Sequence, residues 1–280
     1  MDELSQYIQK QKKILLTLDK SIKQLTQSQT NDSKRLIVLR KELDIIEKIR
    51  PSIQGPPDFI HNLDSLLIQY RGELTQKEDE LKTKFGLELE KLLQMKGLSL
   101  EGQYPTLRTS FYTLVVDIPS NKVSIYFGPE IEKLGVVKAI PEEVADNLVA
   151  FNQKITGRTF DEKKFLQMLL SAYQMSISQK KRQIGEEIPL FDIHAFMVFL
   201  FQDEKFRKNP SKEMLSEYSR PMFSYDLSRL KSKTIDPYEL HFSTATRVDT
   251  KSASDFFWVP TQNGSQNGET IARLKFQGRQ

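Results

Sequence analysis

Residues 4–25 read LSQYIQKQKKILLTLDKSIKQL, and this stretch decides the architecture of the N-terminal part of the chain. Its aliphatic side chains recur at steps of four, seven, three, four and three residues, with Gln11 as the one polar break. Such spacing fits the a and d positions of a heptad, which is typical of a helix that packs lengthwise against another helix. The sequence therefore predicts a long helix with an apolar stripe comprising Leu4, Ile8, Leu15, Leu18, Ile22 and Leu25.

Two further helical runs follow this segment. Residues 26–33 are polar and rich in capping residues, so the first helix ends there or continues weakly. A second periodic run, 36–46, stops before Pro51 and the turn at 54–57, because prolines and glycine cannot continue a helix. A third run extends over about 58–96. Helix, proline turn and helix together predict a long antiparallel hairpin, which is a coiled-coil arm.

The stripes of this arm, which we assign to residues 1–97, allow two interpretations. In a hairpin they would pair with each other, and the arm would be a spacer. However, two helices bury little apolar surface, so a partner protein or a second copy of the arm is the alternative. The residues expected to contact a partner helix are Leu4, Ile8, Leu15, Leu18, Ile22, Leu25, Leu67, Tyr70, Leu74 and Leu81.

Residues 98–280 predict a mixed helical and antiparallel-sheet body. β-branched and aromatic residues flank a short turn-forming loop in a β-hairpin over 111–127. Helical periods follow within 141–230, and a period of two returns in strands over 238–277. Two Asn-Gly pairs between 263 and 268 mark a hairpin loop. The expected fold class is therefore α+β, with a helical arm followed by this body.

Two features within the predicted helices of the body are specific enough to test. Thr159 and Glu162 have the spacing of a capping box, in which Thr would cap a helix and Glu would bond back to the cap. Residues 190–202 are apolar on nearly every face, which predicts a helix at the centre of the core.

Composition restricts the class of protein. Apolar residues make up 38% of the 280 residues and charged residues 28%, as in ordinary globular proteins. The absence of cysteine excludes disulfides, thiolate zinc sites and cysteine nucleophiles. No apolar run is long enough to span a bilayer, and the first residues lack the pattern of a signal peptide. We therefore expect a cytoplasmic protein that has no membrane partner.

No catalytic motif is present in the sequence. It lacks a glycine-rich phosphate loop, a nucleophile elbow and a His-Glu-x-x-His helix, and its three histidines have no metal-binding spacing. We therefore assign no catalytic, metal or cofactor residues and expect no cofactor. The alternative is a metal-dependent hydrolase or nuclease with a dispersed carboxylate site, for which Asp117 and Asp192 are the candidates to replace.

Basic residues are in excess in the C-terminal half. Residues 151–280 contain 20 Lys and Arg against 15 Asp and Glu. Much of this excess lies on three predicted connections between helices, where it is typical either of solvated loops or of a surface that contacts phosphates. The candidates for nucleic-acid contact are Lys180, Lys181, Arg182, Lys205, Arg207, Lys208, Lys212, Arg229, Lys231 and Lys233.

Together these features favour a non-enzymatic subunit of a cytoplasmic multiprotein complex. The arm would assemble with a protein partner or with itself, and the basic loops of the body would contact nucleic acid without sequence preference.

Overall fold

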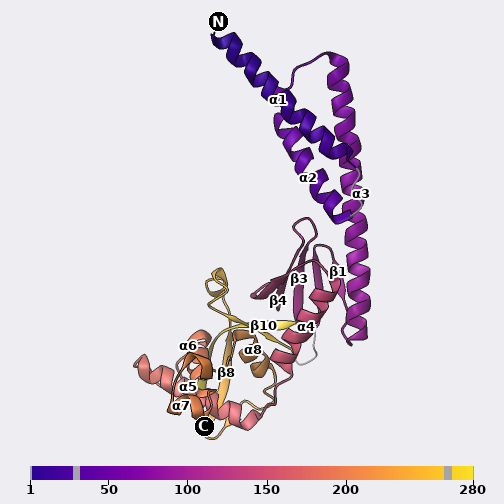
Figure 1. The fold of residues 1–280 in the computed structure, drawn as a ribbon. Helices are drawn as coiled ribbons and strands as arrows, with labels where there is room; N and C mark the ends of the chain where they lie inside the picture. Colours follow the sequence, from indigo (N-terminus) through magenta and orange to yellow (C-terminus); the bar gives the residue numbers. More distant parts are fainter. Residues whose placement is uncertain (1, 28–31, 262–266, 280) are drawn as a thin grey trace. The chain divides into compact units, whose positions relative to one another are not determined.

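The computed structural model describes residues 2–27, 32–261 and 267–279. It contains helices and antiparallel sheets, which confirms the mixed class predicted from the sequence (Figure 1). No helix in these ranges is long and apolar enough to cross a membrane.

The chain divides into two compact units that we describe separately. The first comprises residues 1–88 together with 117–122. The second comprises residues 89–116 and 123–280. The first unit is mainly helical, whereas the second contains both sheets.

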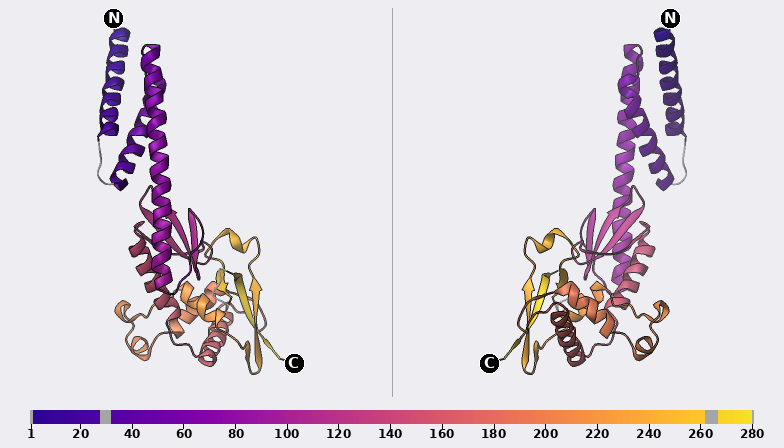
Figure 2. Two further views of the ribbon diagram at one scale, coloured as in Figure 1. Left: turned by 90° about the vertical axis from the view of Figure 1, so that its right-hand side faces the viewer. Right: turned by 90° about the vertical axis from the view of Figure 1, so that its left-hand side faces the viewer.

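Three helices and a short 3-10 turn form the first unit. They are α1 (Asp2–Thr26), α2 (Asp32–Ile49), η1 (Arg50–Ser52) and α3 (Pro57–Met95), of which α3 belongs to this unit up to Glu88 (Figures 1 and 2). The start of α1 bonds to the turn after α2, and Arg35 near the start of α2 bonds to the last turn of α1. Consequently α1 and α2 run antiparallel.

One apolar core joins the three helices. Its buried members are Leu18, Leu25, Leu39, Leu43, Ile46, Ile53, Leu63 and Leu67. This arrangement differs from the expected two-helix hairpin, because α1 is a separate helix that packs on the same core as α2 and α3. A third helix supplies the additional apolar surface that a two-helix pair lacks.

The ends of α3 follow from proline and glycine chemistry. Pro57 occupies its first position, where the missing N–H has no helical partner to lose. Beyond Met95, Gly97 takes a φ of 76°, a left-handed conformation that favours glycine. The N–H of Leu98 then donates to the carbonyl of Leu93 at 2.9 Å, as in a Schellman motif.

A five-stranded antiparallel sheet opens the second part of the chain. Its strands, in spatial order, are β1 (Glu101–Gln103), β2 (Thr106–Thr109), β3 (Tyr112–Asp117), β4 (Lys122–Phe127) and β5 (Glu132–Val137). The hairpin expected over 111–127 is β3 and β4. The three other strands were missed because they are short or carry little apolar alternation.

A second sheet is built around the longest strand, β10 (Gly268–Gly278). Its other strands are β6 (Ile188–Pro189), β7 (Thr234–Ile235), β8 (Tyr238–Thr244) and β9 (Phe257–Pro260). The order is β6-β10-β8-β7, with β9 paired to the first residues of β10. The strands predicted over 238–277 are thus confirmed, whereas most of their Asn-Gly loop, 262–266, lies outside the described residues.

Helices predicted within 141–230 are also present. They are α4 (Pro141–Thr156), α5 (Glu162–Gln179), α6 (Leu190–Leu200), α7 (Glu204–Lys208) and α8 (Arg220–Ser228). Two additional 3-10 turns are η2 (Lys212–Met214) and η3 (Asp249–Lys251).

The predicted capping box at α5 is wrong. Asp161 is the cap, and its carboxylate accepts from the N–H of Lys164 at 3.0 Å. Glu162 instead accepts from the backbone N–H groups of Lys231 and Ser232. These bonds lower the pKa of the Glu162 carboxyl. Asp is at least as good a cap as Thr, so the helix begins two residues later than the box requires.

The expected central position of α6 is only partly correct. Leu190, Ile193 and Met197 are fully buried and face α5 and β10. On the opposite side, Phe191 and Phe199 are exposed. The helix therefore covers the core with one face and presents phenylalanines on the other.

Candidate protein-interaction site

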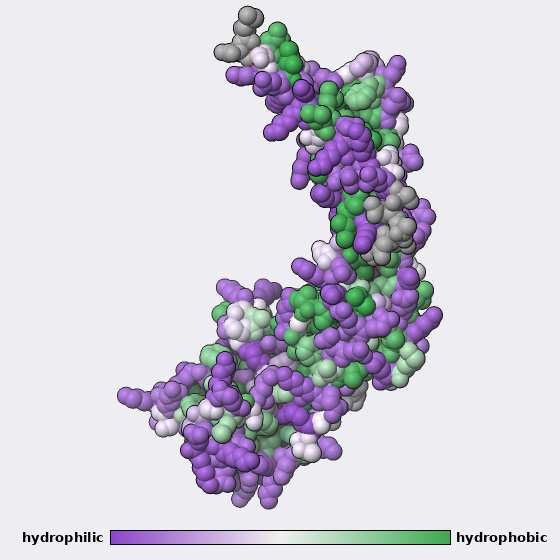
Figure 3. Space-filling model, in the orientation of Figure 1, coloured by the Kyte–Doolittle hydropathy of each residue, from purple (hydrophilic) through white to green (hydrophobic). Residues whose placement is uncertain are grey.

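The first half of α1 carries apolar side chains that are exposed. The exposed fraction is 67% for Leu4, 57% for Ile8 and 61% for Leu16, and Tyr7 and Leu15 are also exposed. Figure 3 shows apolar surface at this end of the molecule bordered by hydrophilic side chains. Single exposed apolar residues are normal, but a contiguous group on one helix marks a surface that binds something. We call these five residues the α1 stripe.

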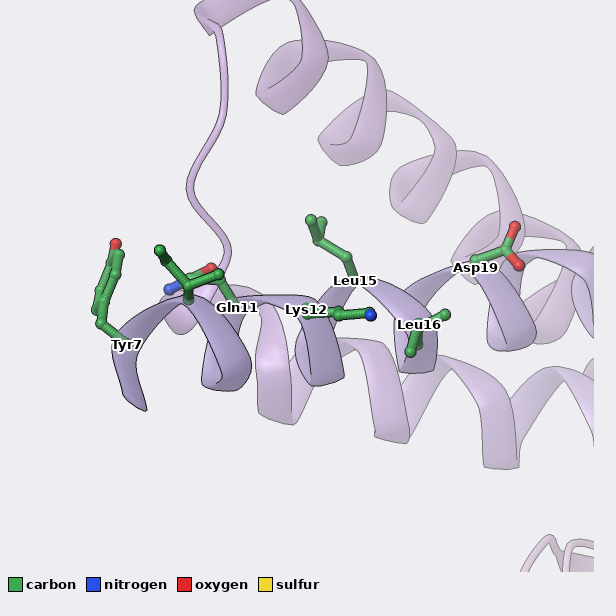
Figure 4. A pocket seen from close by; sticks show the side chains of 7 residues that line it. Tyr7, Gln11, Lys12, Leu15, Leu16 and Asp19 are labelled. Atoms are coloured by element: carbon green, nitrogen blue, oxygen red, sulfur yellow. The ribbon is translucent and has the colours of Figure 1, made fainter. Parts of the chain in front are cut away.

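The stripe borders a shallow groove along α1 (Figure 4). Its volume is about 490 Å³, and it is lined by Tyr7, Ile8, Gln11, Lys12, Leu15, Leu16 and Asp19. The rise of the helix puts Ile8 and Leu15 roughly 10 Å apart along the axis. The lining runs from Tyr7 to Asp19, which is roughly 18 Å or about three turns, with Ile8, Leu15 and Leu16 as its aliphatic members.

The α1 stripe continues, toward the start of the helix, the face of α1 that packs inside the arm. Leu18 and Leu25 are buried in the arm core together with the side chain of Ser21. At 3.6 residues per turn, Ile8 lies roughly 80° around the helix from Leu18, and Leu16 roughly 160°. Tyr7, Leu4 and Leu15 lie only about 20°, 40° and 60° from Leu18, so most of the stripe continues the packed face toward the start of α1, where its side chains are exposed, and only Leu16 lies on the opposite side.

Two hydrogen bonds hold the groove against the rest of the arm. The hydroxyl of Tyr7 donates to the side-chain oxygen of Gln54. The side-chain amide of Gln11 donates to the carbonyl of Ser52 at 3.3 Å. Both acceptors lie between α2 and α3, so one edge of the groove is positioned before any partner arrives.

Arg35 holds the C-terminal end of α1 through hydrogen bonds. Its guanidinium donates to the carbonyl of Leu25 at 2.7 Å and to both carboxylate oxygens of Glu73 at 2.8 Å. It also lies 5.6 Å from the ring centre of Tyr70. The hydrogen bond from Arg35 lowers the pKa of the Glu73 carboxyl and raises that of the guanidinium. This contact ties α1, α2 and α3 together.

The charges around the stripe are mixed. Residues 2–19 include three lysines, Lys10, Lys12 and Lys13, and three acids, Asp2, Glu3 and Asp19. These three lysines are exposed and form no ion pair within the described parts of the chain. The next acid, Asp19, already pairs with Lys23 at 2.7 Å. The groove itself is lined by one charge of each sign, Lys12 and Asp19, so its border has no excess of positive charge.

The residues predicted to contact a partner helix fall into two groups. Leu18, Leu25 and Leu67 are buried in the core of the arm itself. Ile22, Tyr70 and Leu74 pack against that core, and Leu81 is half-buried. Only Leu4, Ile8 and Leu15 are exposed.

The predicted basic contacts are also divided. Six have intramolecular partners: Lys180 with Asp192, Lys208 with Glu204, Arg229 with Asp226, Arg182 and Arg207 with backbone carbonyls, and Lys233 over the ring of Phe242. Four have no ion pair within the described ranges: Lys181, Lys205, Lys212 and Lys231.

Arg229 belongs to a buried network around Asp226. Arg158 donates to the two carboxylate oxygens of Asp226 at 3.0 Å each, and the hydroxyl of Tyr218 donates at 2.7 Å. Burial, reinforced by Asp226, raises the pKa of the Tyr218 hydroxyl. The network borders a pocket of about 700 Å³. Because both oxygens of Asp226 accept from cationic or hydroxyl donors, the carboxylate has a structural role.

The two carboxylates named for a hydrolytic site lie in different units. Asp117 accepts from the backbone N–H of Ser120, and a hydrogen bond from Ser120 lowers its pKa. Asp192 pairs with Lys180. In the described residues no three His, Asp or Glu side chains are grouped in a way that could hold a metal ion.

Tyr7, Leu16 and Lys12 line the groove but were not selected from the sequence. The heptad frame retained Leu15 and discarded Leu16, although adjacent leucines lie on different faces of a helix. The pair Leu15-Leu16 was the available signal that an aliphatic side chain also lies outside the heptad stripe.

Comparison with known proteins returned no matching family model, no matching curated protein and no matching solved structure.

Proposed function

We propose that this chain is a non-enzymatic subunit of a cytoplasmic multiprotein complex and that a protein partner docks on the α1 stripe. The observation that carries the proposal is the exposed first half of the apolar stripe of α1. A helix that already contributes Leu18 and Leu25 to the arm core has no internal need for further exposed aliphatic residues.

The energy available from this face is sufficient to matter. Leu4, Ile8 and Leu16 are each more than half exposed. Covering them would contribute on the order of 3–5 kcal/mol, since full burial of one aliphatic side chain contributes about 1.5–3 kcal/mol. That is the size of an interface hot spot, around which a polar rim completes the contact.

Site-specific photo-crosslinking in the cells that normally express the chain tests this function. A photoreactive amino acid replaces Leu16 in one variant and Ile68 in the control, which is an exposed aliphatic residue elsewhere in the arm. We expect a discrete protein adduct from position 16 that is absent from position 68, and its loss when Ile8→Asp is added. No adduct at position 16, or equal adducts at both positions, would contradict the proposal.

A second activity, contact with nucleic acid, rests on those four of the ten predicted basic residues for which the described parts of the chain provide no ion pair. These are Lys181, Lys205, Lys212 and Lys231. Replacing all four with Gln should weaken binding of duplex DNA and reduce its dependence on salt. A control that replaces four lysines of the arm with Gln should bind as the parent does. Identical binding by the parent and the four-lysine variant would refute this second activity.

A further inference from the structure

We propose that the second unit binds a small neutral molecule that carries hydroxyl groups, in a pocket lined by His194 and Ser219. This pocket belongs to the second unit, whereas the α1 stripe belongs to the first. The inference therefore goes beyond the proposed function and does not depend on it.

The pocket has the size of a small-molecule site. Its volume is about 440 Å³, and such sites usually measure about 300–1,000 Å³. Strand β5, helices α4 and α6 and the start of α8 supply its walls. The apolar part of the lining comprises Leu134, Phe151, Ile155 and Pro221. A ligand of modest size would therefore find apolar contact here beside a few polar groups.

One ring nitrogen of His194 has a partner and the other has none. The Nε2 nitrogen lies 2.9 Å from the backbone carbonyl oxygen of Tyr218. Because a carbonyl oxygen only accepts, Nε2 carries the proton, and the neutral ring keeps its lone pair on Nδ1. Within the described ranges of the chain, Nδ1 forms no hydrogen bond. It is an acceptor that a ligand in the pocket can use.

Packing and electrostatics keep this imidazole fixed and neutral. The ring centres of Tyr218, Phe223 and Phe257 lie 6.1, 5.2 and 5.5 Å from its own. Burial, followed by the charge of Arg220, lowers the pKa of the imidazole. Since the ordinary histidine pKa is already about 6.5, the ring is neutral at neutral pH.

Ser219 supplies a second polar group without a partner. It directly precedes α8, at the position where a serine usually caps a helix, but its side chain makes no capping hydrogen bond. The hydroxyl forms no other hydrogen bond with the residues that the structure describes. A hydroxyl group can both donate and accept. The pocket thus offers one acceptor and one hydroxyl, and both are neutral.

The charged side chains of the pocket already have partners, which favours a neutral ligand. Glu132 pairs with Arg220, and the Lys154 ammonium lies 2.6 Å from a carboxylate oxygen of Glu217. The Lys133 ammonium lies 5.9 Å from the centre of an aromatic ring on the neighbouring strand β4. A charged ligand would compete with these contacts, whereas a hydroxyl group can donate to the free imidazole nitrogen and leave them intact.

Nuclear magnetic resonance of the full chain with ¹⁵N-labelled histidine tests the first step. The chain has three histidines, and a His194→Gln variant identifies the signals of His194. We expect Nε2 to be protonated and Nδ1 unprotonated at neutral pH. The opposite tautomer, or a doubly protonated ring, would contradict the inference.

Four probes then test the class of ligand. Glucose and myo-inositol are neutral, and glucuronate and glucosamine are charged analogues of glucose. We expect a neutral probe at millimolar concentration to shift the Nδ1 signal of His194 and to leave the signals of His61 and His241 unchanged. The charged analogues should bind at least roughly tenfold more weakly, because they disturb the ion pairs of the lining.

Two serine variants separate binding from folding. Ser219→Ala removes a hydroxyl that has no partner within the described chain, so it should retain the stability of the parent. It should weaken binding of the neutral probe roughly three- to tenfold, which corresponds to one hydrogen bond. Ser178→Ala, at an exposed position of α5, is the matched control and should bind as the parent does.

Three results would overturn the inference. They are no shift of the His194 signal with either neutral probe, a charged analogue that binds as tightly as glucose, and unchanged binding by Ser219→Ala. None of them affects the proposal that a partner docks on the α1 stripe. Conversely, absence of the photo-crosslink from position 16 would refute that proposal and leave this inference intact.

Discussion

Replacing Asp226 with Asn removes one charge at the centre of the buried network while leaving its shape almost unchanged. The carboxylate is nearly inaccessible and accepts from Arg158, Arg229 and Tyr218. In the variant, one oxygen becomes an NH2 group that meets donors instead of offering an acceptor. The two guanidinium groups then face each other without the anion between them.

The cost follows from the burial of these groups. The Asp226 side chain is 4% exposed and those of Arg158 and Arg229 are 20% exposed. Breaking a buried ion pair by removing one partner costs about 3–5 kcal/mol. Because the guanidinium groups retain some contact with water, we expect a loss of about 3 kcal/mol. That is a large share of the ~5–15 kcal/mol that stabilises a typical domain.

Urea unfolding followed by tryptophan fluorescence measures this loss. The chain has a single tryptophan, Trp258, which is buried in the same unit as Asp226. Asp236→Asn, at an exposed position, is the matched control and should change the free energy of unfolding by less than about 0.5 kcal/mol. Adding Arg158→Met to the Asp226→Asn variant should recover part of the loss. A loss below about 1 kcal/mol for Asp226→Asn alone would refute the structural role of the network.

Further predictions concern the arm and the aromatic core. Arg35→Met should destabilise the arm by about 2 kcal/mol, because it leaves Glu73 and a helix-end carbonyl without their donor; faster amide exchange in α1 measures this loss, and unchanged exchange would contradict it. Since the pKa of Glu73 is lowered in the folded arm, the arm should lose stability as the pH falls below about 4.5, the ordinary glutamate value, and Glu73→Gln should weaken that dependence in acid melts followed by circular dichroism. Gly128→Ala should destabilise the second unit by roughly 2 kcal/mol or more, since φ is 76° there and the added Cβ would lie 2.7 Å from the ring of Trp258; unchanged urea unfolding would show that this packing is unimportant.

Sequence periodicity was sufficient to predict the main elements of the fold. The heptad spacing of Leu18 and Leu25 reports a buried face of α1, and the alternation in β3, β4, β8 and β10 reports strands that have one face in a core. Local patterns of this kind depend on neighbours along the chain, which the sequence contains.

Contacts between residues that are far apart in the sequence were harder to predict. The apolar helix α6 has Phe191 and Phe199 exposed, because its position at the edge of the core leaves one face uncovered. Glu162 bonds to residues 231–232 in place of its own cap, because a long-range contact was available. Local spacing in the sequence identifies neither the uncovered face of α6 nor the backbone groups that bond to Glu162.

The candidate site was also predicted only in part, because tertiary packing decides which of its residues are exposed. Leu4, Ile8 and Leu15 were expected at a helix interface, but the sequence could not separate them from Leu18 and Leu25, which belong to the same heptad frame. The separation arises because the arm covers only the second half of this stripe. Burial within the arm therefore determines which members of the stripe remain for a partner.

The size of the native complex shows whether a partner docks on the α1 stripe. Size-exclusion chromatography of extracts from cells that normally express the chain compares the parent with Ile8→Asp and with Val248→Asp. We expect the parent and Val248→Asp to elute in one large complex and Ile8→Asp to elute as the isolated chain. Elution of Ile8→Asp with the intact complex, or of the parent as an isolated chain, would contradict it.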